Sequence, residues 1–341
     1  MPVPSDIVNS YNEDIAMRYD ELMETAEKKM KEQGIFERWS LYGAETGYTR
    51  ITNNEFFKTI GLKLRTIDST SADTHAVLFG QKLSTPIIAG AMSNPGIKEM
   101  PAPLQCWAKG MKEAGSMMGV GITSADAFAE VMKIGVPTYR ISKPFKDRQK
   151  VVGEMKEAEK LGAVAVGTDI DFGLGNKVGY KPFYTNEMAP FSCEELTELR
   201  KETKLPFIVK GILHEDDAEK ALKIGADAIV LSNHRAMVLD YCVHPLEVLP
   251  RIREVAGKKI TILVDGGFML GSNVLKALAL GADGVLVGQA ILCGAVANEA
   301  QGVTDMITEM TGQLQRAMML TGCPDLNSIE EFILHKRNYV L

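Results

Sequence analysis

The sequence predicts an α/β fold, a closed (β/α)8 TIM barrel with an N-terminal helical extension, and three observations support this. Short apolar runs recur along the chain, helix-like stretches separate them, and glycines follow several of those stretches. Continuous apolar strands are typical of a parallel sheet buried on both faces. Eight strand–helix units favour a closed barrel over an open sheet. The eight runs are Pro86–Ala91, Ser116–Gly121, Thr138–Ser142, Ala163–Asp169, Pro206–Lys210, Ala226–Ser232, Thr261–Val264 and Gly284–Gly288.

Residues 1–75 are expected to form the extension and lead-in, and residues 76–341 the barrel with a C-terminal helix and tail. Residues 10–33 are charged and carry a partial apolar stripe, which predicts one or two helices packed on the main body. Residues 40–75 show only weak periodicity. The last helix is expected over residues 299–322, followed by a tail over 325–341.

Start and stop signals mark the helices between the strands. Ser124 precedes a stretch with an apolar face, and Ser192 with Glu195 has the form of a capping box. Glycines stand where a left-handed helix cap is favoured. These glycines are Gly115, Gly135, Gly162, Gly225 and Gly281.

An open, doubly wound sheet is the alternative architecture. It predicts fewer strands and an early GxGxxG dinucleotide loop, and the sequence contains no such loop. One segment, Phe172–Pro190, interrupts the strand–helix rhythm and is rich in Gly, Asn, Lys and Pro. Such a segment above a barrel mouth is either a lid or a solvated connector, and the sequence favours neither.

Composition excludes several classes of protein. The net charge of −6, without a basic run, argues against a nucleic-acid partner. No apolar stretch reaches the roughly 18–20 residues that a membrane span needs. The N-terminal segment lacks a signal-peptide core, and the 5 cysteines show no metal-type or CxxC spacing. We therefore expect reduced thiols, a cytoplasmic location and no metal site.

Ionisable residues stand at or just after the ends of four different apolar runs: His234, Asp171, Lys210 and Asp265. The carboxyl ends of parallel strands face one side of a barrel, so these groups should converge at its mouth. A carboxylate there can accept the second N–H of the histidine and fix its tautomer. The alternative for each residue alone is structural, because a lone histidine usually packs and Asp169 can cap a turn.

Glycines also stand near the ends of the last two runs, at Gly266, Gly267 and Gly288. They allow the backbone to approach a phosphate closely, and this is the usual phosphate site of such barrels. Taken alone this signal is weak, because many strand–helix turns need glycine.

Several segments carry a resemblance to a known family over roughly residues 41–330. The matching segments are Leu205–Leu213, Gly225–His234, Val264–Gly267 and Gly271–Ala282, with weaker matches at Tyr42–Glu45, Leu78–Ile87 and Thr321–Cys323. Together they resemble the FMN-dependent α-hydroxy-acid oxidase/dehydrogenase family, which includes glycolate oxidase, lactate oxidase and flavocytochrome b2. The chain is similar to it as a divergent member.

The resemblance implies FMN as the cofactor, a small-molecule substrate and a homo-oligomer, a tetramer in the family. It implies that His234 takes the substrate hydroxyl proton while hydride passes to the flavin, that Asp171 orients His234, and that Lys210 contacts the flavin. The cofactor contacts that it implies are Ala89, Gly90, Ala91, Ser124, Asp169, Lys210, Ser232, Asp265, Gly266, Gly267, Gly288 and Gln289.

The sequence departs from the family where the substrate should bind. Met237 stands where the family has the arginine that grips a carboxylate, and Trp39 and Lys143 stand near expected tyrosines. Asp169 replaces a threonine, and Arg235 or Lys143 can supply a substitute cation. The expected substrate side consists of Trp39, Lys143, His234, Arg235 and Met237.

The phosphate side departs as well, because Met269 and Gln289 stand where the family has arginines. The resulting hypothesis is an FMN-dependent oxidoreductase with an altered substrate pocket, acting on something other than a plain 2-hydroxy acid such as lactate. Two alternatives stay open. One is a non-redox isomerase or lyase that uses His234 and Asp171. The other is a ligand-binding protein that has lost oxidase activity.

Overall fold

The fold is a barrel of parallel strands surrounded by helices, shown by a computed structural model that describes residues 19–35, 43–95, 100–174, 176–178, 181–183 and 187–337. The strands follow one another around the ring in the order β4-β14-β13-β12-β11-β8-β7-β6-β5. Their bounds are β4 Ile87–Ala89, β5 Ala91–Met92, β6 Met118–Val120, β7 Thr138–Ser142, β8 Ala165–Asp169, β11 Phe207–Ile212, β12 Ala228–Leu231, β13 Thr261–Val264 and β14 Gly284–Val287.

The nine strands correspond to eight positions around the ring, because β4 and β5 are two halves of one strand interrupted at Gly90. The first half pairs with β14 and the second half pairs with β6, both in parallel. The interrupted strand therefore joins the two ends of the sheet and closes it. Each of the eight predicted apolar runs contains strand residues, so the predicted (β/α)8 barrel is confirmed.

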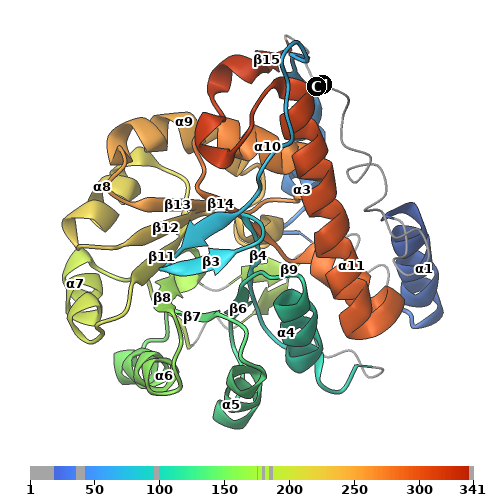
Figure 1. The fold of residues 1–341 in the computed structure, drawn as a ribbon. Coiled ribbons are helices and arrows are strands. Elements are labelled where there is room, and N and C mark those ends of the chain that lie inside the picture. The colour runs from blue at the N-terminus through green and yellow to red at the C-terminus, as the bar shows by residue number, and fades with distance from the viewer. Residues whose placement is uncertain are drawn as a thin grey trace.

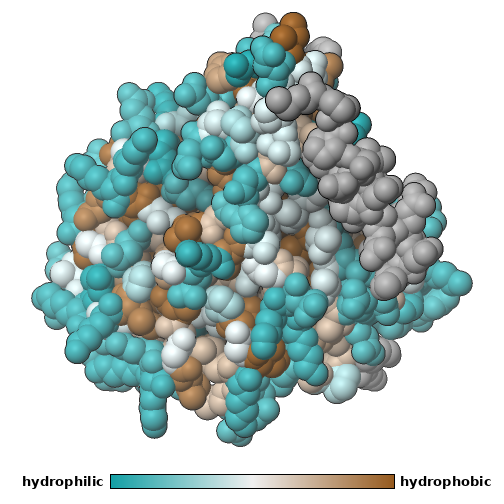
Figure 2. All heavy atoms as spheres, viewed as in Figure 1, coloured by the Kyte–Doolittle hydropathy of each residue, from teal (hydrophilic) through white to brown (hydrophobic). Residues whose placement is uncertain are grey.

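Helices form the outer layer and alternate with the strands along the chain (Figure 1). Their bounds are α4 Pro103–Glu113, α5 Ala125–Ile134, α6 Arg148–Lys160, α7 Cys193–Lys201, α8 Glu215–Lys223, α9 Pro245–Ala256, α10 Gly271–Ala279 and α11 Gln289–Thr321. On the face drawn in Figure 2, hydrophilic residues cover much of this layer. Among the residues that the structure describes, no helix combines the length and apolar character that crossing a membrane requires.

The predicted helix signals act as expected. Ser124 accepts a hydrogen bond from the backbone N–H of Ala127 at 3.2 Å, and the reciprocal capping box of Ser192 and Glu195 is formed. Gly135 ends α5 with a φ of 77°. The four other glycines named as helix ends also have positive φ values, where a side chain would be strained.

Apolar side chains fill the inside of the barrel, and a hairpin closes its amino end. The hairpin consists of β2, Ala76–Leu78, and β3, Gln81–Leu83, paired antiparallel. Leu78 and Leu83 pack with the inward-facing strand residues Ile88, Leu263 and Leu286. A Cβ on Gly284, the first residue of β14, would lie 3.1 Å from Leu78, so the hairpin sits at the strand beginnings. The opposite end is left for a site.

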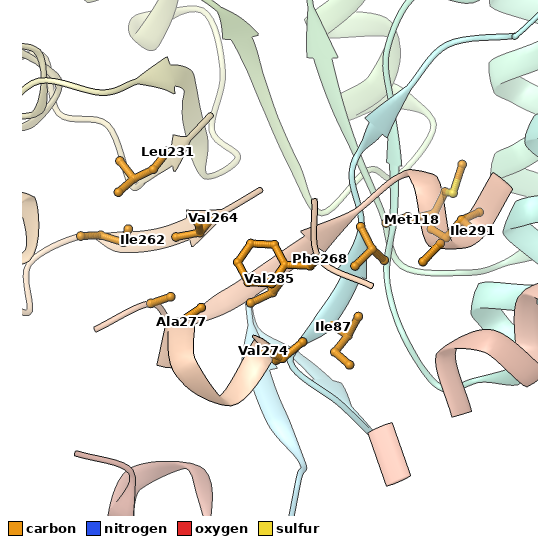
Figure 3. Packing of buried hydrophobic residues seen from close by; sticks show 14 of the residues in the cluster. Ile87, Met118, Leu231, Ile262, Val264, Phe268, Val274, Ala277, Val285 and Ile291 are labelled. Atoms are coloured by element: carbon orange, nitrogen blue, oxygen red, sulfur yellow. The ribbon is translucent and has the colours of Figure 1, made fainter. Parts of the chain in front are cut away.

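A second apolar layer lies between the strands and the helices. In Figure 3, Val274 and Ala277 of α10 lie beside Val285 of β14, and Phe268 extends the same cluster. Burial of this kind contributes about 25 cal/mol for each Å² of apolar surface removed from water. It holds the helices against the ring and fixes the loops at the strand ends.

The segment before the barrel contributes helix α1, Tyr19–Glu32, and helix α3, Tyr48–Phe56, with a 3-10 turn η2 at Phe57–Thr59. α1 packs against α11 through Leu22, Ala26 and Met30, as the apolar stripe predicted, although residues 1–18 lie outside the described chain. Strand β1, Ile60–Leu62, pairs antiparallel with β15, Leu334–Lys336, so the tail returns to this segment.

The last helix starts earlier than predicted. α11 begins at Gln289 rather than residue 299, and its backbone breaks at Asn298 and Glu299. A Cβ on Gly294 would lie 2.3 Å from the carbonyl oxygen of Gly302, so the two halves of α11 pack backbone to backbone. The sequence signal began only after this break. Two short 3-10 turns, η5 Leu326–Ser328 and η6 Glu331–Ile333, follow.

The segment Phe172–Pro190 begins with a 3-10 turn η3, Asp171–Leu174, and contains a small hairpin. Its strands are β9, Asn176–Val178, and β10, Lys181–Phe183, paired antiparallel. The hairpin is local order that the sequence did not predict. A lid function for this segment stays a prediction.

Candidate active site

A cavity opens at the carboxyl ends of the strands, where barrel enzymes place their active sites. It encloses about 730 Å³ of space not filled by protein atoms, counting the part open to solvent. Its lining residues are Gly90, Ala91, Met92, Lys210, His234, Arg235, Asp265, Gly266, Gly267, Phe268, Leu286, Val287, Gly288 and Gln289.

His234 stands on a strained turn just after β12. This turn, η4, covers His234–Ala236, and its three residues have consecutive positive φ values of 49°, 57° and 63°. Such values are costly for residues with side chains, so surrounding contacts must hold the turn. The Oγ of Ser232 accepts the backbone N–H of His234 at 3.1 Å, and the carbonyl of Ala236 accepts the N–H of Ala44 at 2.6 Å. Strain of this kind often marks a functional site.

The imidazole of His234 has a different partner on each nitrogen. Nδ1 lies 2.9 Å from an oxygen of Asp171, and Nε2 lies 3.3 Å from the Nζ of Lys143. An ammonium group can only donate and a carboxylate can only accept. The neutral ring therefore donates from Nδ1 to Asp171 and accepts at Nε2. Lys210 also lies 3.3 Å from Nδ1, but two donors meet there, so Asp171 is the hydrogen-bond partner.

Burial lowers the pKa of His234, and the ammonium groups of Lys143 and Lys210 lower it further, while Asp171 opposes the change. The ring is thus held neutral below the ordinary histidine range. A neutral imidazole with its proton on Nδ1 has a lone pair on Nε2, as a proton acceptor requires. Phe172 packs against the ring with centroids 4.2 Å apart.

Asp171 reaches His234 because Gly211 leaves room for it. A Cβ built on Gly211 would lie 2.6 Å from the Cγ of Asp171, and the φ of Gly211 is 103°. Any side chain at this position would both clash and be strained. The glycine in the register shift of β11 therefore positions the carboxylate that orients the base.

Lys210 connects the acidic groups of the mouth. Its Nζ lies 3.1 Å from Asp169, 3.1 Å from the Oγ of Ser232 and 3.9 Å from Asp265. Burial alone would lower the pKa of Lys210, but the three carboxylates around it, Asp169 first, raise that pKa above its usual range. Lys210 is therefore a permanent cation at the base of the cavity.

Asp169 lies between two ammonium groups. It forms a short ion pair with Lys143 and a second pair with Lys210. Burial would raise the pKa of Asp169, yet Lys143 and Lys210 hold it well below its usual range, so the carboxylate stays ionised. Asp169, Asp171 and His234 place possible metal-ligand atoms within 4.8 Å of one another. The two ammonium groups already compensate these carboxylates, which makes the cluster a poor cation site.

Asp265 presents an unused acceptor. One carboxylate oxygen accepts the hydroxyl of Ser232 at 2.8 Å, whereas the buried Oδ1 has no hydrogen-bond partner within the described part of the chain. Burial raises the pKa of Asp265, although Lys210 opposes this. A buried acceptor without a partner costs free energy, so a donor from a ligand fits this position.

The structure brings most of the predicted site residues together. One connected cluster contains His234, Asp171, Lys210 and Asp265, as the strand-end argument predicted, and also includes Ser232, Asp169 and Lys143. Gly90, Ala91, Gly266, Gly267, Gly288, Gln289 and Arg235 line the cavity. Three predicted residues lie elsewhere: Ala89 is buried in β4, Ser124 caps α5, and Met237 follows η4 without lining the cavity. Trp39 lies outside the described residues.

Several residues of the site were missed by the sequence analysis, because their signals were weak. Met92 continues the interrupted first strand, and Phe172 directly follows Asp171, so position along the chain could have indicated both. Phe268 and Leu286 also line the cavity, but their apolar character looked like ordinary core. The side-chain amides of Asn233 and Asn53 of α3 donate hydrogen bonds to each other, and only the folded structure reveals this pair.

The cavity suits FMN. Four glycines line it, so several backbone segments approach a ligand without side chains between. The unpaired oxygen of Asp265 can accept a hydroxyl of the ribityl chain, and Lys210 can stand beside the electron-accepting edge of the ring. α11 begins at the cavity with Gln289 and has no side-chain cap, so its first N–H groups can bind a phosphate.

Comparison with known proteins agrees with this fit. The chain matches the FMN-dependent dehydrogenase family over residues 27–177 and 174–336. It is 31% identical to 2-hydroxyacid oxidase 1 of Mus musculus, over 77% of this chain and 82% of that protein. It is 29% identical to L-lactate oxidase of Lacticaseibacillus rhamnosus, over 85% of this chain and 86% of that protein.

Solved structures share the fold. Mandelate oxidase superposes with a TM-score of 0.85 at 24% identity, over 95% of this chain and 99% of that one. A mandelate oxidase mutant with an FMN adduct superposes with a TM-score of 0.82 at 26% identity, over 92% and 98%. With the family match and the cavity described above, these likenesses lead to one conclusion. The chain belongs to the FMN-dependent dehydrogenase family and is an FMN-dependent oxidoreductase of the α-hydroxy-acid dehydrogenase type.

Proposed function

We propose that His234 is the base that removes the proton from the hydroxyl group of the substrate. The observation that carries this is the paired imidazole: Nδ1 donates to Asp171 at 2.9 Å, which leaves the lone pair of Nε2 on the opposite side. Asp171 fixes the tautomer and stabilises the positive charge that the ring acquires with the proton. Proton transfer of this kind typically contributes a rate factor of about 10²–10⁴.

When bound, FMN supplies the two-electron acceptor for the hydride that leaves the hydroxyl-bearing carbon. Lys210 holds a positive charge at the base of the cavity, because three carboxylates raise its pKa above its usual range. We infer that this charge favours negative charge on the reduced ring. Ser232 and Asp265 hold Lys210 in place, and the glycine segments exclude side chains from the space beside it.

The substrate that we propose is a small compound with a hydroxyl group next to a carbonyl group. The curated relatives carry names of 2-hydroxyacid and lactate oxidases, which supports a hydroxyl on the carbon that gives up hydride. The substrate side differs here, because Lys143 and Asp169 form an ion pair beside His234. We therefore propose a substrate other than plain lactate.

Anaerobic mixing of the FMN-loaded protein with candidate hydroxy compounds tests this function. We expect bleaching of the visible absorption band of the oxidised flavin and formation of a carbonyl product. His234→Asn should retain bound FMN yet bleach about 10³-fold more slowly. Turnover without bleaching would instead support the isomerase or lyase alternative. Ligand binding without any turnover would support a lapsed enzyme.

We also propose an assembly and a setting for the enzyme. The resemblance supports a homo-oligomer, a tetramer in the family, and the five cysteines of the chain are all free, which supports a reducing cytoplasm. We propose that residues 1–75 act as a helical extension to a barrel of residues 76–341. Size-exclusion chromatography with light scattering tests the assembly, and a monomer at micromolar concentration contradicts it.

A further inference from the structure

Lys143 covers the nitrogen at which the proposed base must work. Its Nζ lies 3.3 Å from Nε2 of His234 and 3.9 Å above the centre of the Phe172 ring. A hydroxyl that gives its proton to Nε2 must come within about 2.6–3.2 Å of that atom. The ammonium group and the oxygens of the substrate therefore share one small space, and a bound substrate contacts Lys143.

The charge of Lys143 is already cancelled. Its ammonium forms a short ion pair with Asp169, and the two side chains are only 9% and 3% exposed. The second oxygen of Asp169 lies 3.1 Å from Lys210. Pairs in such a buried setting are weakly screened, so the carboxylate and the ammonium remain together.

Among the described residues that lie closest to His234, the positive and negative charges balance. Lys143 and Lys210 face the carboxylates of Asp169 and Asp171, so these four charges sum to zero, and Asp265 adds negative charge where it is ionised. Arg235 also lines the cavity, and its guanidinium interacts electrostatically with Arg50 and Cys293.

Building on the proposed function, we propose that the Lys143–Asp169 pair selects the substrate by charge. The enzyme prefers a hydroxy compound whose neighbouring carbonyl group is uncharged, such as an amide, an ester or a ketone, to one with a free carboxylate. The ammonium of Lys143 donates a hydrogen bond to that carbonyl oxygen. Asp169 holds the ammonium in place and removes its attraction for a carboxylate.

The preference follows from what each ligand would bring. A carboxylate adds a further negative charge close to Asp169 and Asp171 and loses its hydration on entry, with no unmatched cation in the cluster to compensate it. A neutral carbonyl has a smaller desolvation cost and still accepts the hydrogen bond from Lys143. Specificity then arises from the repulsive carboxylates as much as from the attractive lysine.

Two ligands of the same shape test this. Pyruvate and pyruvamide have nearly the same size and differ in charge and in the N–H donors of the amide, and calorimetry on the purified FMN-loaded protein measures their binding without turnover. We expect the wild-type protein to bind pyruvamide at least about tenfold more tightly. Asp169→Asn uncovers the charge of Lys143, so the affinity for pyruvate should rise about tenfold while that for pyruvamide changes little. The double variant Lys143→Met/Asp169→Asn should lose the gain.

Matched variants keep the result decisive. Asp169→Thr should repeat the effect of Asp169→Asn, and Lys156→Met, in a surface pair with Glu202, should change neither affinity. If both Asp169 variants fail to fold, Lys143→Met decides, because loss of its hydrogen bond should weaken pyruvamide and the uncompensated carboxylate of Asp169 should weaken pyruvate at least as much. Equal or tighter binding of pyruvate by the wild type overturns the proposal. The proposal is also overturned if the double variant keeps the gain in pyruvate affinity of Asp169→Asn. Failure of the wild type to bind either ligand overturns it as well.

This outcome can be separated from the proposed function. A protein that prefers pyruvamide but whose flavin no hydroxy compound reduces has the charge selection without the redox activity. A protein that oxidises lactate faster than lactamide, with both kcat/KM values measured, has the redox activity without the charge selection. The two proposals therefore fail on different measurements.

Discussion

The two ends of the barrel are built from opposite kinds of residue. At the amino end, Leu78 and Leu83 of a hairpin fill the ring with apolar surface. At the carboxyl end, Lys143, Asp169 and Lys210 bring buried charges within hydrogen-bonding distance of one another. Apolar packing stabilises a fold directly, whereas buried ion pairs often cost more in desolvation than they return. One end therefore supports stability and the other is retained for chemistry.

The largest effect is expected from a substitution of His234, the proposed proton acceptor at the carboxyl end of the barrel. His234→Asn removes the proton acceptor, so kcat/KM should fall about 10³-fold, which corresponds to about 4 kcal/mol of transition-state stabilisation. The free energy of unfolding should change by much less, because the contact with Phe172 is the main packing that the smaller side chain loses. Anaerobic stopped-flow reduction and chemical denaturation measure the two quantities. A variant that keeps more than a tenth of the activity contradicts the role of His234.

The amino end should respond in the opposite way. Leu83 is 2% exposed inside the ring, so Leu83→Ala should lower the free energy of unfolding by about 3 kcal/mol. Activity of the folded fraction should stay within about twofold, because the site lies at the other end. Val77, on the same hairpin but 68% exposed, provides the control: Val77→Ala should change stability little. Urea denaturation monitored by circular dichroism measures the free energies of unfolding of both variants, and equal losses contradict the packing role of Leu83.

A smaller loss of activity is expected from a substitution of Asp171, the carboxylate that orients His234. Asp171→Asn leaves the ring poorly oriented, so kcat should fall about 10–100-fold. Burial lowers the pKa of His234, and Asp171 opposes this, so its loss should lower that pKa further. A base must be neutral to work, so the acid limb of the kcat/KM profile should move to lower pH. A shift to higher pH contradicts the contact.

The smallest effect is expected from Lys143→Met, and it has the opposite sign. Burial and then the positive charge of Lys143 lower the pKa of His234, so removal of that charge should raise the pKa. The acid limb should therefore move to higher pH, toward the ordinary histidine value of about 6.5. Profiles of the two variants measured side by side give two shifts of opposite direction. Shifts in the same direction contradict the arrangement in which Nδ1 faces Asp171 and Nε2 faces Lys143.

The amino-acid sequence was sufficient to predict the barrel and to identify the charged residues at its mouth. Continuous apolar runs such as Gly284–Gly288 can only be buried on both faces, and glycines such as Gly135 end helices for a backbone reason. Residues at strand ends meet on one rim in any parallel barrel, so His234, Asp171 and Lys210 were found without coordinates. Local backbone rules were sufficient for these inferences.

The pairing of the charged side chains at the mouth could be learned only from the folded structure. The placement of Lys143 between Asp169 and Nε2 of His234 depends on the register of β7 beside β8, which spacing along the chain does not encode. The early start of α11 depends on the close approach of Gly294 and Gly302. Distances between residues far apart in the chain arise only when packing fixes the elements, and the chemistry of this mouth depends on those distances.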